Sequence, residues 1–302
     1  MKDVVSKTAR DIKSMKVRGA LDIAVAAAEA LRNSVALGKT PKDLAKDGAK
    51  LKYARPTAVS LPNAVNYVLE VVEENKNLAK SDFKKKNLEQ IDSFISEQKN
   101  SIARIAEIGS RLIEKNDTIL THCQSDTVEG IFIKAWKDGV KFDVVCTETR
   151  PRHQGYLTAK ILKKNKVPVT LIIDSAVNHM LKKLEVDKVF VGADAVLANG
   201  DVINKIGTSQ VAVCANSMEI ELIVATQSIK FSPESVYGKV IEIEDRGSKE
   251  ITSELKGVRI LNPAFDVTPA HHISKIITEH GIIPPAAAYQ MLRHFKYKIE
   301  NE

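Results

Sequence analysis

The chain has 302 residues, of which 27% are charged, and its formal net charge is +7. This length suits one large domain or two ordinary ones, and the sequence has neither an apolar run long enough to span a membrane nor a signal-peptide core. The basic residues are dispersed and aromatic residues are sparse, which argues against nucleic acid and favours an anionic small molecule as the partner. We therefore expect a cytoplasmic protein that binds neither nucleic acid nor membranes.

Neither a disulfide framework nor a metal site is predicted. The three cysteines, Cys123, Cys146 and Cys214, form no CxxC pair. His271 and His272 are adjacent, and adjacent residues on the helix expected there point in different directions. The sequence also lacks a Walker-type phosphate loop and a strand-GxGxxG-helix unit. We therefore expect no metal and no organic cofactor.

Residues 1–116 are predicted to form an N-terminal helical domain. Apolar residues recur at helical spacing, with Ile23, Ala27 and Leu31 on one face of the second helix. Thr40 and Pro41 form an N-cap and first-turn pair for the third. Helices are expected at 4–15, 18–37, 40–53, from 60 onward, and at 81–114.

Residues 117–302 are predicted to form a Rossmann-like domain of the α/β class, with a mainly parallel sheet and helices on both faces. Short apolar strands alternate there with helices, which is the pattern of crossover connections. Strands are expected at 118–121, 142–147, 167–173, 188–191 and 222–225. The less regular tail adds expected strands at 240–245 and 258–261, and helices at 270–280 and 285–298, the first of which ends at Gly281.

Polar residues follow each predicted strand, and the carboxyl ends of parallel strands meet at one edge of a sheet. These segments are 122–127, 147–150, 174–175, 192–194 and 227–230. Cys123 is the sharpest candidate among them, because helix amides and nearby cations can activate a thiol at a strand-to-helix turn. The alternative is a small apolar core residue, an interpretation that also fits Cys146 and Cys214.

The segment 192–208 is expected to be a polar loop between a strand and a helix, where open α/β sheets bind ligands. Asp194 at its start suits either proton transfer or capping of the following turn. Lys205 can neutralise a phosphate, and the amides of the helix that begins at Thr208 can hydrogen-bond one. Weaker phosphate-binding candidates are Arg55 and the helix start Arg18-Gly19-Ala20.

Together these motifs resemble one protein family. It contains the alpha, beta and delta subunits of the translation-initiation guanine-nucleotide exchange factor (initiation factor 2B), methylthioribose-1-phosphate isomerase and archaeal ribose-1,5-bisphosphate isomerase. The resemblance covers nearly the whole chain. It rests on Val17-Arg18-Gly19-Ala20, Leu120-Thr121-His122-Cys123, Thr147-Glu148-Thr149-Arg150-Pro151 with Gln154-Gly155, Asp174-Ser175-Ala176, Gly192-Ala193-Asp194, Asn199-Gly200 and Asn204-Lys205-Ile206-Gly207-Thr208.

Within this family the chain resembles the ribose-1,5-bisphosphate isomerase branch. It keeps Cys123 and Asp194, which the regulatory alpha subunits usually lack. It has Ala195 where the methylthioribose branch usually carries arginine. The tail segments 262–269 and 281–285 also resemble the ribose-bisphosphate branch. One departure is Gln124, where asparagine is expected beside the candidate cysteine.

The resemblance implies an aldose–ketose isomerase that converts α-D-ribose 1,5-bisphosphate to D-ribulose 1,5-bisphosphate in AMP degradation, by acid–base catalysis with ring opening. Cys123 would accept a proton and Asp194 would donate one. The residues expected to hold the sugar phosphate are Arg18, Gly19, Ala20, Arg55, Ser125, Asp126, Thr127, Asn204, Lys205 and Lys230. A homo-oligomer is also implied, either a dimer or a hexamer built as a trimer of dimers. The alternatives are a methylthioribose-1-phosphate isomerase, a non-catalytic regulatory subunit and a sugar-phosphate sensor with weak catalysis.

Overall fold

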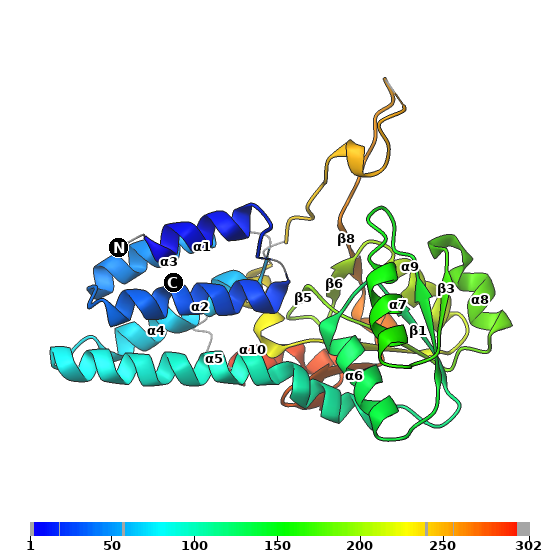
Figure 1. Cartoon of the computed structure of the whole chain (residues 1–302), viewed down its shortest axis with the longest axis horizontal. Coiled ribbons are helices and arrows are strands. Elements are labelled where there is room, and N and C mark those ends of the chain that lie inside the picture. The colour runs from blue at the N-terminus through cyan, green and yellow to red at the C-terminus, as the bar shows by residue number, and fades with distance from the viewer. Residues whose placement is uncertain (1–2, 18, 56–57, 239–240, 256, 295–302) are drawn as a thin grey trace.

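The computed structural model describes residues 3–17, 19–55, 58–238, 241–255 and 257–294. Helices occupy one end of the molecule, and a β-sheet with its own helices occupies the other (Figure 1). The helical region contains α1 (Val4–Lys13), α2 (Ala20–Ala36), α3 (Pro41–Lys52), α4 (Ser60–Asn75) and α5 (Lys80–Ser110). These helices confirm the predicted ones, although α5 is shorter than expected. No helix in the described ranges is long and apolar enough to cross a membrane.

Local chemistry and packing explain where these helices lie. The Asp43 amide donates to the Thr40 hydroxyl at 3.3 Å, and Pro41 occupies the first turn of α3, as predicted. Ile23 and Leu31 of α2 are fully buried in the core of the helical region. The far end of α5 leaves this core and packs on α6 (Asp126–Lys137). Helix α5 therefore connects the helical region to the sheet.

A seven-stranded sheet forms the centre of the second region, counted over the described residues. Its strands lie in the order β10-β9-β7-β4-β1-β2-β3, and every neighbouring pair is parallel except β9 with β10. The strands are β1 (Thr118–His122), β2 (Asp143–Thr147), β3 (Val169–Ile172), β4 (Lys188–Val191), β7 (Glu221–Ala225), β9 (Lys275–Thr278) and β10 (Gly281–Ile283). The predicted fold class, α/β with a mainly parallel sheet, is confirmed.

Helices cover both faces of this sheet, because successive residues of a strand point to opposite sides. In β4, Phe190 packs on the face of α5, α6 and α7 (Gly155–Lys164). Its neighbours Val189 and Val191 pack on the other face, which α8 (Val177–Lys183), α9 (Thr208–Asn216) and α10 (Ala288–His294) cover. All three side chains are buried, which explains the continuous apolar run in the sequence.

The strand order reverses between β1 and β4. From β1 the chain proceeds to β2 and β3 on one side, whereas from β4 it proceeds to β7 and β9 on the other. His122 and Val191, at the carboxyl ends of β1 and β4, are partners in the register. Open α/β sheets bind ligands outside the carboxyl ends of their strands at such a reversal. The segments that follow His122 and Val191 therefore border the expected crevice.

The segment 192–208 is more regular than the predicted loop. It contains β5 (Ala195–Val196) and β6 (Val202–Lys205), which pair as an antiparallel hairpin. A distant strand, β8 (Phe265–Thr268), pairs with β6 and completes a small sheet. The prediction of a single loop is wrong because a two-residue strand has no visible periodicity and β8 is remote in sequence. The small sheet fixes Lys205 at its end.

Two strands predicted in the tail are absent from the described residues. The ranges 241–245 and 258–261 form no strand, and an isolated bridge joins Asp245 to Pro263. Residue 240 lies outside the described residues. The stretch between Asp245 and Pro263 projects away from the body of the molecule (Figure 1). The side chains of Val258 and Leu261 are exposed, so no sheet face buries them as it would bury the apolar residues of a strand.

The helix predicted at 270–280 is also wrong. The chain instead forms a 3-10 turn at Ala270–His272 and then β9, and Gly281 begins β10 rather than ending a helix. Ile276 and Ile277 are fully buried within the sheet, a setting that suits β-branched residues in a strand. The last predicted helix is confirmed only as a 3-10 turn at Pro285–Ala287 followed by α10, because its final residues lie outside the described ranges.

Gly155, the first residue of α7, contacts the end of β2 so closely that a Cβ atom would lie 1.7 Å from the Thr147 carbonyl oxygen. Because backbone cannot yield as a side chain can, we predict that Gly155→Ala lowers the free energy of unfolding by about 1–3 kcal/mol or more. Gly130→Ala in α6 is the matched control, since its nearest contact would be 3.4 Å. Alanine there should be neutral or stabilise by up to about 1 kcal/mol. Urea unfolding measures both, and equal stabilities would contradict this packing.

Candidate active site

Cys123 and Asp194 follow the two strands that flank the reversal of strand order. Cys123 comes directly after β1, is buried, and has a left-handed backbone with φ of 69°, which is uncommon outside glycine and often marks a functional site. Asp194 is partly buried after β4, and its amide donates to the Ile203 carbonyl at 2.8 Å. Its carboxylate makes no hydrogen bond to any residue that the structure describes. The two side chains the sequence singles out are thus brought together.

Burial controls the state of the Cys123 thiol. It raises the pKa of Cys123 to about 12, against an ordinary value of 9.0. The positive charge of Lys205 and the Gln124 amide oppose this rise, whereas the Asp194 carboxylate adds to it. The cation expected beside the cysteine is therefore present, but burial outweighs it. Burial therefore favours the neutral thiol over the thiolate.

A buried chain of hydrogen bonds fixes the backbone of Cys123. Its amide donates to the Thr149 hydroxyl at 2.9 Å, which lies 3.2 Å from the Thr147 hydroxyl. Thr147 in turn lies 2.7 Å from His122 Nδ1, and His122 Nε2 lies 2.9 Å from the Ile206 carbonyl oxygen. A carbonyl only accepts, so Nε2 carries the proton and every donor along the chain points toward Ile206. Burial lowers the pKa of His122 and keeps its ring neutral.

Asp174, predicted to lie in the crevice, serves the same framework. Its two carboxylate oxygens accept the amides of Thr149 and Arg150, each at 2.7 Å. The turn after β2 is thereby tied to the turn after β3. Asp174 therefore positions Thr149, which holds Cys123.

The start of α9 does not offer its amides to a phosphate, contrary to our expectation. Asp266 of β8 accepts the Gly207 amide at 2.7 Å and the Ser209 amide at 3.2 Å. Asn204 is also engaged, because its side-chain amide donates to the Thr208 hydroxyl at 3.0 Å. The sequence could not reveal this cap, since Asp266 arrives from a strand remote in the chain.

Two other helix starts are open. Neither Ser125 at the start of α6 nor Gly19 at the start of α2 caps its helix with a side chain. Burial raises the pKa of Asp22 in α2, and the charge of Asp126 in α6 raises it further. The two helix starts are therefore close together. Ser125 also lies against Gly192, where a Cβ atom would be 2.6 Å from its hydroxyl oxygen.

The remaining residues predicted to hold the substrate near these helix starts differ in their burial and bonding. Thr127 is buried, and its hydroxyl donates to the Ala225 carbonyl at 2.7 Å, which anchors α6 to β7. Asp126 is exposed and accepts the Gln124 side chain at 2.7 Å. The departure at Gln124 therefore turns its amide toward α6. Ala20 begins α2, whereas Arg18 lies outside the described residues.

Sequence reasoning missed Glu129. It is buried beneath the Cys123 turn, and burial raises the pKa of its carboxyl to about 7. The Thr158 hydroxyl lies 2.8 Å from Glu129 Oε1 and 3.2 Å from the Cys123 carbonyl oxygen. An acid among the apolar residues of α6 was the only sequence signal, and it is a weak one.

Lys230 lies in the 3-10 turn η2 (Ser228–Lys230) and reaches the edge of the crevice. Its amine donates to the Ala193 carbonyl at 2.8 Å, beside Asp194. Burial lowers the pKa of Lys230, and the Asp194 charge opposes that change. The Asn63 side chain of α4 grips the same turn, donating to the carbonyl oxygens on either side of Lys230, each at 2.8 Å. The helical region thus helps to place Lys230.

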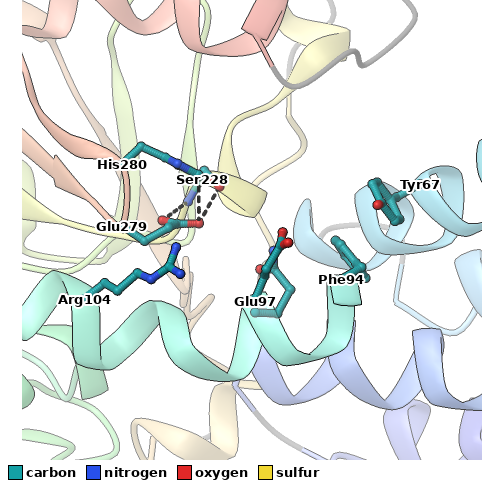
Figure 2. Close-up of a pocket in the computed structure, with 8 residues that line it drawn as sticks. Tyr67, Phe94, Glu97, Arg104, Ser228, Glu279 and His280 are labelled. Carbon is teal, nitrogen blue, oxygen red and sulfur yellow. Dashed lines mark hydrogen bonds and ion pairs between the residues drawn. The ribbon is translucent and has the colours of Figure 1, made fainter. Parts of the chain in front are cut away.

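A hollow bordered by α5 lies beside η2 at Ser228 (Figure 2). Glu279 accepts the Ser228 amide at 2.9 Å and also the Ser228 hydroxyl. The hollow is lined by Tyr67, Phe94, Glu97, Gln98, Arg104, Ser228, Glu279 and His280. Cys123, Asp194 and Lys230 do not line this hollow, so it is not part of the crevice at the reversal of strand order.

Arg55 and Lys205 lie near the carboxylate of Glu244. Lys205 is buried at the end of β6, where burial lowers its pKa. A guanidinium nitrogen of Arg55 is 3.9 Å from Glu244 Oε2. Arg246 pairs with the same carboxylate, and no sequence motif had singled it out. Among the described residues, no group of three or more His, Cys, Asp or Glu side chains could hold a metal ion.

Comparisons of this sequence with known proteins point to one family. The model of the initiation factor 2 subunit family matches residues 16–285. The chain is 43% identical to ribose 1,5-bisphosphate isomerase of Methanocaldococcus jannaschii, covering 97% of this chain and 96% of that protein. It is 41% identical to methylthioribose-1-phosphate isomerase of Acetivibrio thermocellus, covering 91% of this chain and 86% of that protein.

A solved structure agrees with these sequence relationships. Translation initiation factor eIF-2B from Pyrococcus horikoshii OT3 superposes with a TM-score of 0.78 at 26% identity, covering 94% of this chain and 98% of that one. Sequence and fold therefore agree over nearly the full length. The chain belongs to the initiation factor 2 subunit family.

Proposed function

We propose that this protein is a ribose 1,5-bisphosphate isomerase, which converts the cyclic aldose bisphosphate to D-ribulose 1,5-bisphosphate. The observation that carries the proposal is the placement of Cys123 and Asp194 after neighbouring strands at the reversal of strand order. Lys205 and Lys230 supply positive charge beside them. The full-length similarity to a ribose 1,5-bisphosphate isomerase supports the same reaction.

The chemistry needs one acid and one base. A furanose with phosphate on its anomeric oxygen cannot open spontaneously, so ring opening must be coupled to loss of the C2 proton. Asp194 gives a proton to the ring oxygen as the C1–O bond breaks, and the Cys123 thiolate takes the proton from C2. In the enol phosphate that results, C1 receives the proton from Cys123, and the C2 hydroxyl returns a proton to Asp194. Both groups regain their starting states, so the steps balance without a cofactor.

The charges of the two groups are coupled. The ionised Asp194 carboxylate raises the pKa of Cys123, and Lys205 lowers it. When Asp194 carries the proton that it will donate, its unfavourable effect on the thiolate disappears. The reactive combination is therefore a protonated Asp194 with an ionised Cys123, as expected for an acid–base pair with opposed tasks.

The proposed substrate contacts fall on two sides of this pair. On one side, the open helix starts at Gly19-Ala20 and Ser125 can present amides to a phosphate, as helix N-termini do. On the other side, Lys205 and Arg55 can pair with a phosphate. Thr127 and Asn204 contribute by holding backbone, since their side chains are already bonded. Arg18, Asp126 and Lys230 complete the predicted set.

A methylthioribose-1-phosphate isomerase is the second candidate, and the 41% identity to such an enzyme favours it. Its substrate carries one phosphate, whereas a bisphosphate needs two anion sites. A non-catalytic subunit is the third candidate, favoured by the likeness to an initiation-factor structure. Such a subunit would bind partner chains without turning over a sugar phosphate.

Further inferences rest on the family resemblance. We infer that residues 1–116 and 117–302 are separate domains and that the protein is a cytoplasmic homo-oligomer acting in AMP degradation. A dimer and a trimer of dimers differ threefold in mass, so light scattering after size-exclusion chromatography distinguishes them.

Replacement of either proton-transfer group tests the proposed function. Cys123→Ser and Asp194→Asn should each slow the formation of ribulose 1,5-bisphosphate by roughly 100-fold or more, because each removes one acid–base step. Cys214→Ser and the exposed Asp138→Asn are matched controls that should retain the wild-type rate. Circular dichroism checks that all four variants fold. Full activity of either site variant would refute the roles assigned here.

The pH dependence of Cys123 alkylation gives an independent prediction. Because burial raises its pKa to about 12 rather than 9.0, the iodoacetamide rate at Cys123 should rise about tenfold per pH unit through pH 9–11. Lys205→Met should lower that rate at pH values where Lys205 is charged, and the difference should shrink as the pH approaches 10.5, because burial lowers the pKa of Lys205 below that ordinary value. Mass spectrometry of the Cys123 peptide measures both, and a plateau near pH 9 would contradict the prediction.

A further inference from the structure

Arg246 lies at the base of the projecting segment and shares an aromatic ring with Lys205. The Lys205 amine is 4.6 Å from the centre of the Phe265 ring, and the Arg246 guanidinium carbon is 6.0 Å from it. Lys205 and Phe265 are partners in the register of β6 and β8. Two cations this close to one aromatic ring repel each other, and a nearby anion offsets that repulsion.

Glu244 supplies that negative charge. The Arg246 Nε atom is 3.2 Å from Glu244 Oε1, and an Arg55 guanidinium nitrogen is 3.9 Å from Oε2. Only 11% of the Arg246 side chain and 19% of the Arg55 side chain are exposed. Within the described residues, Glu244 Oε2 is buried without a hydrogen bond. The carboxylate is therefore an incomplete partner for two largely buried guanidinium groups.

The cluster has an excess of positive charge next to the proposed catalytic pair. Lys205, Arg55 and Arg246 against the single carboxylate of Glu244 leave two positive charges, which match a phosphate dianion. Glu250 is also nearby, but it pairs with Arg152. Lys205 is within electrostatic reach of both Cys123 and Arg246. The cluster thus borders the crevice.

We propose that Arg246, together with Arg55 and Lys205, binds one of the two phosphate groups of the substrate, and that Glu244 is an internal counter-ion which this phosphate displaces. The proposal rests on the proposed function and deepens it, because it supplies the second anion site that a bisphosphate requires. Guanidinium groups suit this task, since their N–H groups match phosphate oxygens in pairs. The open starts of α2 and α6 remain for the other phosphate.

We predict that Arg246→Gln and Glu244→Gln change substrate binding in opposite directions. Arg246→Gln should raise the KM for ribose 1,5-bisphosphate roughly 10- to 100-fold with little change in kcat, because a charged hydrogen bond is lost. Arg246→Lys should restore part of the affinity. Glu244→Gln should lower KM, since a competing anion is removed. Arg32→Gln, which breaks the Arg32–Asp92 ion pair of the helical region, is the matched control and should leave KM unchanged.

Binding of inorganic phosphate separates this proposal from the proposed function. Calorimetry should show weaker phosphate binding by the Arg246→Gln protein than by the wild type, whether or not the wild type turns over ribose 1,5-bisphosphate. An inactive wild type would refute the proposed function alone. Unchanged KM and phosphate affinity in Arg246→Gln, or weaker binding in Glu244→Gln, would overturn the role assigned to this cluster.

Discussion

Parallel pairing between β1 and β4 is the constraint on which the rest of the site depends. It aligns His122 with Val191, so the next residues of both strands emerge side by side where the strand order reverses. Cys123 and Asp194 are far apart in the chain, and this pairing brings the two residues proposed as base and acid to the same edge of the sheet. The helices on both faces bury the alternating side chains of these strands and so hold the pairing in place.

The turns around the crevice are held by buried polar bonds and by close backbone contacts. The chain from Cys123 to Ile206 links the end of β1 to the segment that enters α9. Gly192 lets the turn after β4 approach Ser125. Such a framework fixes the site before substrate arrives, which lowers the entropic cost of aligning the reacting groups. Several motif residues, among them Thr149 and Asp174, thus hold the backbone around the crevice.

The sequence predicted the elements that have a local pattern and missed the features that depend on contacts between distant segments. Helices through α5 and the first five strands of the main sheet were predictable, because apolar residues at helical spacing mark the helices and short continuous apolar runs mark the buried strands. Ile276 and Ile277 were wrongly assigned to a helix, since an apolar pair before Gly281 fits both the end of a helix and a strand. Only pairing with β7 makes this segment a strand. The Asp266 cap and the Arg246 cluster depend on contacts between distant segments, which no local pattern encodes.

The proposed reaction is the isomerisation of a bis-phosphorylated ribose in the crevice. Its most direct test is competition in one tube, with equal amounts of ribose 1,5-bisphosphate and 5-methylthioribose 1-phosphate followed by NMR. We predict that the ribose 1,5-bisphosphate signals give way to those of ribulose 1,5-bisphosphate while the methylthioribose compound persists. Preferential consumption of the methylthioribose compound, or no conversion of either sugar, would contradict it.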